Sequence, residues 1–339
     1  MGLVRIRLLA LSMMLWLATF ASRAWAGKND LQLLNLCPSA ASILKVPECS
    51  WVQRGSAGSI TGSVVPDAQG RADFRSLMSE LGVVLAPRIP SVAETGGIKG
   101  FQLSLDLGLT EISNNQRYWN GVEGVSATNP NGGPRPDPML TTIGAFVRKG
   151  IWLPVPTMEL GFGAVHLLDS HLTSWQGYMK VAIHEGFHDW ALPSFALRLA
   201  VAYLTGTDQV TMTTTSLDLL VSKGFALLKT AQIEPFAGWS WISIFAHSGL
   251  INATPSCGAN QPVGSNPGDS SCANFSFPDQ DAITRFRLFV GFRLKFSVVF
   301  FAAQYDVFFA DSSRYAGSDS AKDQSATQNA LSLSAGLGF

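Results

Sequence analysis

Residues after position 100 alternate between apolar and polar side chains with a period of two. The pattern is clearest at 101–110, where a phenylalanine and four leucines hold the odd positions and polar or small residues hold the even ones. Successive side chains of a strand point to opposite faces, so this stretch predicts a strand with one apolar and one polar face. The same pattern, weaker in places, predicts about ten strands: 99–111, 139–151, 157–168, 172–184, 194–204, 208–222, 234–248, 283–295, 297–309 and 327–339.

The connections between the predicted strands fall into two sets. Those after the even-numbered strands are short or modest, whereas those after the odd-numbered strands include the three longest, at 113–138, 249–281 and 311–326. An even number of antiparallel strands that closes into a barrel places short turns at one end and long loops at the other. The sequence therefore predicts an all-β fold, an antiparallel transmembrane β-barrel of about ten strands with a small, partly helical N-terminal segment.

The composition limits the class of protein further. Apolar residues make up 47% of the 339, charged residues only 14%, and 24 basic residues balance 24 acidic ones. An ordinary soluble domain has about 25% charged residues. The low and balanced charge excludes a disordered chain and a basic nucleic-acid-binding protein. Beyond residue 26, the best candidate for an apolar span, at 296–310, is interrupted by Gln304 and Asp306, which argues against a bundle of membrane-spanning helices.

The N-terminus has the features of a secretory signal peptide. Arg5 and Arg7 precede an apolar run at 8–20, and Ala24-Trp25-Ala26 matches a small-residue cleavage sequence. We expect residues 1–26 to be removed, so that the exported chain starts near Gly27. An uncleaved membrane anchor is the alternative. No cysteine stands at the cleavage point to indicate a lipid anchor.

Residues 27–97 lack the two-residue alternation. One apolar face at helical spacing predicts a helix between Arg71 and Arg88; its residues are Phe74, Leu77, Met78, Leu81 and Leu85. We expect this segment to cap or enter the periplasmic side of the barrel as a plug, with its apolar face packed against neighbouring residues or, alternatively, in contact with a ligand. The predicted division is a signal peptide at 1–26, this plug-like segment at 27–97 and the barrel at 98–339.

Four cysteines lie in two local pairs. Cys37 and Cys49 are twelve residues apart, and Cys257 and Cys272 are fifteen apart in a stretch rich in glycine, proline, asparagine and serine. Four cysteines allow three pairings, but each of these pairs closes a short local loop. We therefore expect two local disulfides, as suits an exported protein. The spacing does not match a zinc site, and we predict no metal and no other cofactor.

The last nine residues alternate in the same way and end on an aromatic ring. Their apolar positions are Leu331, Leu333, Ala335, Leu337 and Phe339. This strand resembles the C-terminal strand of bacterial outer-membrane β-barrels. The resemblance implies a place in the bacterial outer membrane, with lipid as a partner and with the terminal phenylalanine as the signal read by the barrel assembly machinery. It names no subfamily, and a soluble sandwich is the alternative fold.

The polar faces of the predicted strands carry charged side chains. A charge on the lipid face near the middle of a membrane would cost about 2–4 kcal/mol for Arg or Lys, so these residues should face the lumen. They are Asp106, Arg148, Glu159, Lys180, Arg198, Asp218, Arg285, Arg287, Arg293, Lys295 and Asp306, together with His184. Two interpretations stay open. In one, acids and bases pair to fill a narrow barrel; in the other, the four bases at 285–295 form a wall that attracts small anionic solutes.

Barrel size and motifs limit the function. Ten strands should leave a narrower lumen than the open channel of a barrel with about sixteen, so a general diffusion pore is not expected. His166, Asp169, Ser170 and His171 cluster at one predicted outer turn, but their spacing matches no nucleophile motif, and we predict no catalytic residues and no enzyme. The sequence favours restricted passage or binding of small solutes. The alternatives are a structural or surface-binding barrel acting through its outer loops and, less favoured, a barrel enzyme.

Overall fold

The structure, a computed structural model, describes residues 27–40, 48–52, 64–124, 135–151, 157–185, 192–228, 231–254, 273–310 and 322–339. The expected signal peptide at 1–26 lies outside the described residues, and so does the expected disulfide between Cys257 and Cys272. The expected disulfide between Cys37 and Cys49 is present, with 5.4 Å between the two Cα atoms.

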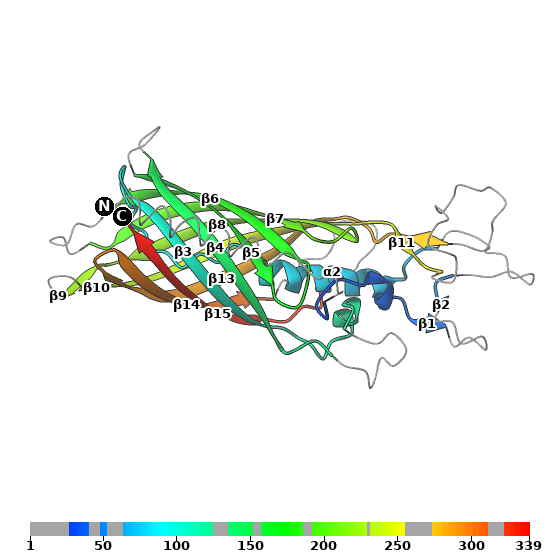
Figure 1. Cartoon of the computed structure of the whole chain (residues 1–339). Helices are drawn as coiled ribbons and strands as arrows, with labels where there is room; N and C mark the ends of the chain where they lie inside the picture. The colour runs from blue at the N-terminus through cyan, green and yellow to red at the C-terminus, as the bar shows by residue number, and fades with distance from the viewer. Residues whose placement is uncertain are drawn as a thin grey trace, which may run out of the picture.

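Ten antiparallel strands close into a barrel (Figure 1). The first barrel strand, β3, pairs with the last, β15, and β10 pairs with both β8 and β13. A short strand, β9 (Phe225–Leu228), pairs only with the start of β10. The ten strands are β3 (Phe101–Glu111), β4 (Met139–Ile151), β5 (Met158–Leu167), β6 (Thr173–His184), β7 (Ser194–Thr205), β8 (Val210–Ser222), β10 (Ala231–Ser248), β13 (Gln280–Phe296), β14 (Val299–Phe309) and β15 (Gln328–Gly338). The predicted fold class is confirmed, and each predicted strand overlaps an observed one.

The remaining described elements are short, apart from one helix. They are η1 (Leu33–Leu36), β1 (Ser39–Ala40), β2 (Glu48–Cys49), α2 (Ala68–Val84), η2 (Arg117–Gly121), β11 (Ile251–Asn252) and β12 (Asn274–Phe275). Strand β1 pairs with β2, and β11 pairs with β12. Among the described residues, no helix is long and apolar enough to cross a membrane.

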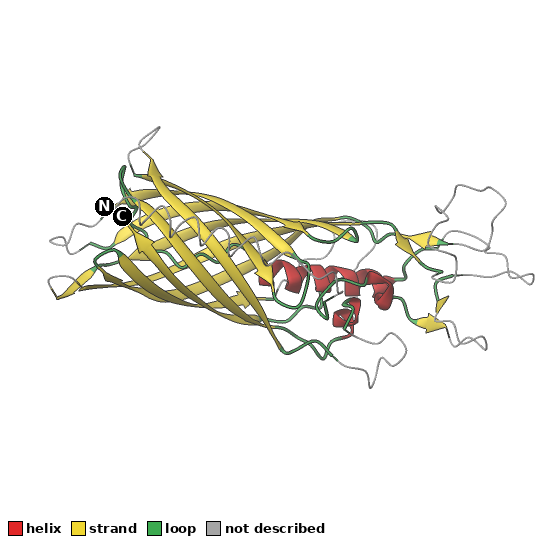
Figure 2. Cartoon of the chain, in the orientation of Figure 1, coloured by secondary structure: helices red, strands yellow, loops and turns green. Residues whose placement is uncertain are grey.

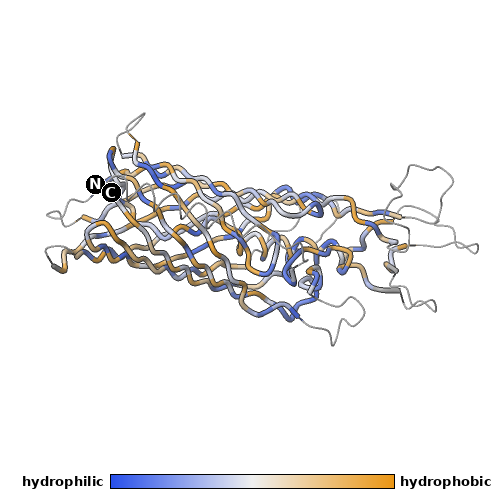
Figure 3. Tube along the Cα trace, viewed as in Figure 1, coloured by the Kyte–Doolittle hydropathy of each residue, from blue (hydrophilic) through white to orange (hydrophobic). Residues whose placement is uncertain are grey.

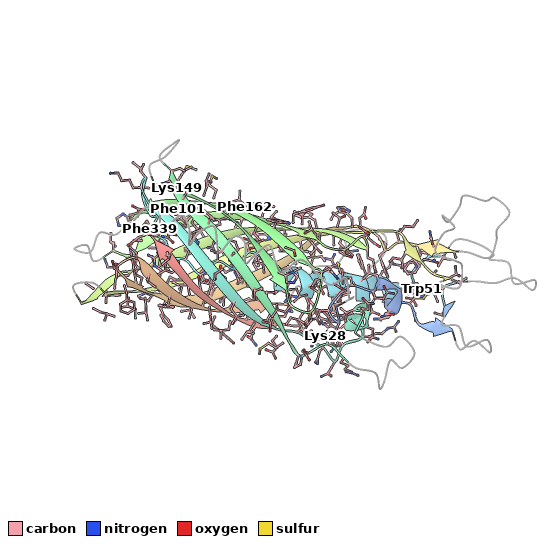
Figure 4. All side chains as sticks on the ribbon, in the orientation of Figure 1. Lys28, Trp51, Phe101, Lys149, Phe162 and Phe339 are labelled. Carbon is pink, nitrogen blue, oxygen red and sulfur yellow. A yellow bond between two sulfur atoms is a disulfide. The ribbon has the colours of Figure 1, made fainter. Side chains whose placement is uncertain are left out.

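The two ends of the barrel differ in their connections. At one end, here called the turn end, the Phe339 N–H donates to the Phe101 carbonyl at 2.8 Å, and the Phe101 N–H donates to the Phe339 carbonyl at 3.1 Å. The opposite end, here called the loop end, carries the three longest connections, 112–138, 249–279 and 310–327. Figure 4 places Phe101 and Phe339 at the turn end and Lys28 in the other half of the molecule.

The outer face of the barrel is apolar on all ten strands. Leu105 is 50% exposed, whereas the preceding Ser104 is only 5% exposed, and Figure 3 shows this alternation of hydropathy along the strands. Exposed apolar side chains include Leu103, Leu107, Ile143, Val147, Leu160, Phe162, Trp175, Met179, Leu199, Val201, Leu217, Leu219, Trp241, Leu288, Val290, Phe301, Tyr305, Leu331 and Leu333. The period of two therefore sets which side chains face outward and which face the lumen.

Helix α2 lies inside the half of the barrel that belongs to the loop end (Figure 2). After it, residues 85–100, here called the threading segment, cross the lumen to reach β3 at the turn end. The prediction that the N-terminal segment enters from the periplasmic side, the side of the short turns, is therefore wrong about the side. Local pattern does not report which mouth a segment enters, because that depends on packing against distant strands.

Helix α2 begins and ends where its sequence requires. The Asp67 side chain accepts a hydrogen bond from the Gly70 N–H at 2.7 Å and caps the N-terminus. Pro87 and Pro90 follow the last turn, and proline does not continue a helix, so the predicted extension to position 88 stops at Val84.

One continuous apolar cluster joins α2, the loop-end half of the barrel wall and the outer loops. Its members include Phe74, Leu77, Met78 and Leu81 of α2, the wall residues Leu140, Leu167, Leu204, Met212, Ile242, Ile244 and Phe308, and the loop residues Leu33, Leu36, Tyr118, Trp119, Phe275 and Phe277. Gly82 allows the close approach of α2 to β10, since a Cβ there would lie 2.6 Å from Ile244 Cδ1. The loop-end half of the lumen is therefore packed like the core of a soluble domain.

Candidate functional site

A row of charged and polar side chains crosses the lumen wall between α2 and the turn end. It occupies directly paired positions on six neighbouring strands: Glu159 (β5), Lys180 (β6), Arg198 (β7), Asp218 (β8), Ser240 (β10) and Arg287 (β13). We call this row the polar belt. It brings together side chains that are up to 128 residues apart in sequence, because each strand contributes one lumen-facing position at the same height.

The polar belt is an ion-pair network. Asp218 accepts from Arg198 Nε at 2.6 Å and from Arg287 Nη2 at 3.0 Å, and Arg287 Nη1 lies 3.8 Å from Asp306 Oδ1. A second pair joins Lys180 Nζ to Glu159 Oε1 at 3.1 Å. The three cations of the belt thus face three carboxylates, with Asp306 of β14 as the third. All of these side chains are buried, and charges are tolerated in such a place only when they are paired and hydrogen-bonded.

The belt cations also hold the threading segment. Arg287 Nη1 donates to the Pro87 carbonyl at 3.0 Å, and Arg198 Nη1 donates to the Ile89 carbonyl at 2.8 Å. Lys180 Nζ donates to the carbonyls of residues 92 and 94 at 3.1 and 3.0 Å. Each cation therefore binds both a wall carboxylate and the main chain that fills the lumen.

The sequence of the threading segment explains why it needs these donors. Its two prolines carry no N–H, and the segment belongs to no helix or strand, so its carbonyls have no regular backbone partners. Buried carbonyls require hydrogen bonds, which the ionised side chains of the wall supply. Wall side chains also accept from the segment: the Ala93 N–H donates to Ser222 Oγ at 2.9 Å.

The other predicted lumen charges do not join the belt. Arg148 donates to the Pro90 carbonyl at 3.4 Å, Arg293 pairs with Glu234, and Arg285 donates to Ser79 of α2 at 3.1 Å. Asp106 has both carboxylate oxygens buried in the lumen wall, away from the belt register. Lys295 is exposed at the turn end. The four bases of β13 thus have four different surroundings and do not form one continuous free basic surface.

A buried carboxylate ties α2 to the outer loops. Glu80 accepts hydrogen bonds from Tyr118 Oη and Trp119 Nε1, both at 2.7 Å, from the Ser113 N–H at 3.0 Å and from the Ala326 N–H at 3.2 Å. Burial, together with the neighbouring Glu80 carboxylate, raises the pKa of Tyr118 well above its usual value. The helix and two loop-end connections are therefore fixed to one another through a single side chain.

The predicted outer-turn cluster acquires a partner from the N-terminal segment. Asp30 Oδ2 lies 2.6 Å from His171 Nδ1, and Asp30 Oδ1 accepts from the His171 N–H at 2.6 Å. Ser170 Oγ donates to the Leu167 carbonyl and accepts from the Leu172 N–H, so its hydroxyl is engaged within the turn. His166 is on the outer face, with Nδ1 3.1 Å from Thr173 Oγ1. These contacts do not arrange a nucleophile beside the Asp30–His171 pair.

Hollows in the described part of the barrel differ in what they face. A hollow of about 780 Å³ lies on the outer face, where Ala145, Ala164, Ala303 and Ala335 leave a depression between larger apolar side chains. Smaller hollows in the lumen include one of about 20 Å³ beside Arg88 and one of about 80 Å³ at the turn end between Lys295 and Phe339. The large hollow faces away from the lumen and offers no path through the barrel.

The charged wall was expected from the sequence, but three further groups with specific contacts were not. Glu80, Ser240 and Asp30 were not predicted as site residues. Glu80 carried a signal, since it is a carboxylate on a helix whose other face is strongly apolar. Asp30 carried none, because its partner His171 is 141 residues away in the chain.

A closed barrel with an even number of antiparallel strands, an apolar outer face and a polar lumen wall defines a class. The protein is an integral β-barrel of the bacterial outer membrane. In this class the short turns face the periplasm and the long loops face outward, so the turn end is periplasmic and the loop end is the outer end.

Comparisons with solved structures return barrels of the same class at low similarity. The outer-membrane protease OmpT of Escherichia coli is 7% identical, with 71% of this chain and 95% of that chain covered and a TM-score of 0.33. Neisserial surface protein A is 10% identical (72% and 97% covered, TM-score 0.27), and the N-terminal barrel domain of Pseudomonas aeruginosa OprF is 11% identical (70% and 97%, TM-score 0.24). No protein-family model and no curated protein matches the chain. Likeness at this level carries no argument about activity.

Proposed function

We propose that the protein is a plugged outer-membrane barrel that acts at the cell surface, as a binding or structural element built on its outer end. The observation that carries this proposal is the packing of α2 in the continuous apolar cluster of the outer half of the lumen. A helix held in this way closes the barrel and at the same time gives the outer loops a rigid base.

Moving α2 out of the lumen would cost a large free energy, and this supports a closed barrel. Phe74, Leu77, Met78 and Leu81 are each no more than 1% exposed. Full burial of such a side chain is worth about 1.5–3 kcal/mol, so exposing four of them to water would cost about 6 kcal/mol or more. At that cost the open form would hold less than about one molecule in 10⁴.

The outer end is built as one rigid unit. Trp51 packs edge-on against Phe275 with 5.2 Å between ring centroids, and Phe74 stacks on Phe277 at 4.6 Å. These contacts join the disulfide-bonded segment, α2 and the connection between β10 and β13. Surface-binding proteins place adaptable loops on such a scaffold, which fits the proposed role.

Two measurements on the full chain test the proposal. Refolded into planar bilayers, the protein should show no stable conductance steps. In lipid nanodiscs, the protein should bind one or more members of an array of glycans and extracellular matrix proteins. Replacement of residues 255–272 by a short Gly-Ser linker should remove that binding. Stable, solute-selective conductance together with an unreactive array would overturn the surface role.

Restricted passage of small anions is the second candidate, and one observation favours it. In the periplasmic half of the lumen, the threading segment is held by hydrogen bonds and by two small apolar clusters. The 80 Å³ hollow at the turn end lies beside Arg293 and Lys295. Polar contacts can be replaced by water at lower cost than an apolar core. Under this candidate, Arg287→Glu should change the anion preference of any conductance that appears.

A further inference from the structure

The first described residue folds back on its own turn. The Gly27 N–H donates to Asp30 Oδ2 at 2.7 Å, and the Asp30 N–H donates to the Gly27 carbonyl at 2.9 Å. This turn lies at the outer end of the barrel, next to the β5–β6 connection, where the Asn29 N–H donates to the Asp169 carbonyl at 3.0 Å. The nitrogen of Gly27 thus lies within hydrogen-bond distance of a carboxylate that is itself bound to the β5–β6 connection.

The Asp30 carboxylate is organised to accept more than one donor. Its side chain is 13% exposed, and it also binds the His171 N–H and ring nitrogen, both at 2.6 Å. Other ionisable groups described at this rim include Lys28, Asp137 and Asp169, with Lys28 Nζ at 2.5 Å from Asp137 and 3.5 Å from Asp169. Among these described side chains, three carboxylates face one lysine.

The position of Gly27 accepts no side chain. A Cβ at this residue would lie 2.2 Å from the Asp169 carbonyl oxygen and 2.8 Å from Ser170 Cα, both of which are backbone atoms. Any larger residue would have to push the β5–β6 turn away. The site therefore fits a glycine, and the residue at this position is the one that the expected cleavage after Ala26 would leave at the N-terminus.

We propose that processing between Ala26 and Gly27 creates an α-ammonium group that docks on Asp30, so that the new N-terminus is itself a structural group of the outer rim. Hydrolysis adds one water across the peptide bond: the carboxylate leaves with Ala26, and the amine stays on Gly27, where it takes up a proton. The protease is of the kind that reads small residues before the cleaved bond.

An ammonium fits this site better than the peptide N–H of an unprocessed chain. It adds a positive charge where three carboxylates face one lysine, and its ion pair with Asp30 adds a Coulomb attraction that a peptide N–H, which already donates to an ionised acceptor, does not have. It also offers further donors, while the backbone atoms of the β5–β6 turn pack against Gly27 Cα. Processing thereby completes the attachment of the N-terminal segment to the outer end of the barrel.

The first part of the test is the identity of the N-terminus. Protein extracted from outer membranes should begin at Gly27 by N-terminal sequencing and intact mass. A start at any other residue overturns the proposal.

The second part is the reactivity of the α-amine. An amine-reactive reagent at neutral pH labels α-amines before lysines, and peptide mass spectrometry then reports the rate at Gly27. We expect labelling at least about tenfold slower in the folded protein than in the same protein unfolded in denaturant. Asp30→Asn should restore most of the rate, whereas the control Asp137→Asn, which removes a carboxylate bound to Lys28 at the same rim, should not.

Equal labelling of folded and unfolded protein would overturn the docking of the ammonium, and so would a rate that Asp30→Asn leaves unchanged. If Asp30→Asn does not assemble, the comparison of folded with unfolded protein decides the question on the natural sequence. None of these measurements depends on what the outer loops bind.

Discussion

Arg198 and Asp218 face each other in direct register across β7 and β8, with Nε 2.6 Å from Oδ2 and neither side chain exposed. Asp218 also accepts from Arg287, so one carboxylate compensates two guanidinium groups from opposite sides. Since both guanidinium groups also hold the carbonyls of the threading segment, Asp218 joins the barrel wall to the plug.

Removal of Asp218 should therefore destabilise the barrel strongly. Asp218→Ala leaves two buried cations without their shared partner, and breaking a buried pair in this way costs about 3–5 kcal/mol. Unfolding in urea, followed by tryptophan fluorescence in detergent micelles, measures the difference. Asp137→Asn, which breaks the exposed pair with Lys28, should change stability by less than about 1 kcal/mol. Similar effects of the two substitutions would contradict the role given to the belt.

The two faces of a strand should be distinguishable by labelling. Leu105 is half exposed on the outer face, whereas the carboxylate oxygens of the adjacent Asp106 are buried in the lumen wall. A thiol reagent restricted to lipid should label Leu105→Cys and leave Asp106→Cys unlabelled. The two positions are adjacent, so depth in the membrane is nearly the same and only the face differs. Equal labelling of both variants would rule out the lipid-facing assignment.

The barrel wall was predictable from the sequence because its cause is local. A residue such as Leu105 faces lipid or lumen according to its position in the strand, and the pattern of two is visible without knowledge of any neighbour. The same pattern placed Arg198, Asp218 and Arg287 on the inner face. It did not show that they meet at one height, since that depends on the register between strands.

For a related reason, the helix of the plug-like segment could be predicted, but its position in the barrel could not. The apolar face of Phe74, Leu77 and Leu81 indicated a buried helix, but its contacts are made with strands far along the chain, such as β10 at Ile244. Nothing in the local pattern of residues favours the outer mouth over the periplasmic one. Nor did it connect Asp30 with His171, because neither residue stands in a motif.

Glu80 should be needed for the attachment of α2 to the outer loops. Glu80→Ala leaves two buried side-chain donors, Tyr118 Oη and Trp119 Nε1, and two part-buried backbone N–H groups without an acceptor, at a cost of about 1–3 kcal/mol for each buried donor before relaxation. We expect faster amide hydrogen exchange in α2 and η2 by mass spectrometry. Glu111→Ala is the matched control, since Glu111 binds Asn329 at an exposed position and its loss should leave exchange unchanged. Unchanged exchange in Glu80→Ala would show that the apolar cluster alone holds the helix.

Asp73 should make stability depend on pH. Burial raises the pKa of this carboxyl, and the Gln69 hydrogen bond and the Arg117 charge only partly oppose the effect. Folding therefore favours the protonated form, so the stabilisation is complete below the unfolded pKa and is lost as pH rises through the folded one. Asp73→Asn should be more stable than the natural chain at pH 7 and no more stable at pH 3, as measured by urea unfolding at both values. A difference that is the same at both pH values would contradict this assignment.

Deletion of Phe339 should impair insertion of the barrel. The residue ends the chain at the periplasmic end, where its backbone forms a reciprocal pair of hydrogen bonds with Phe101. Phe339 as a whole is 62% exposed, at the membrane boundary where aromatic girdles lie. The deletion removes the reciprocal pair and the interfacial ring and, by the resemblance of the last strand, the assembly signal as well. Fractionation should show less protein in the outer membrane and more of a protease-sensitive form in the periplasm.

Phe339→Tyr separates the ring from the backbone contacts and serves as the control. Tyrosine keeps an aromatic ring at the interface and keeps both hydrogen bonds to Phe101, so insertion should be close to that of the natural chain. Phe339→Ala should fall between the two, because it keeps the backbone pair and loses the ring. If the deletion inserts fully, the terminal ring is neither an anchor nor a signal, since chain ends are often dispensable. The closure between β3 and β15 would then rest on the pairs from Gln102 to Thr110 alone.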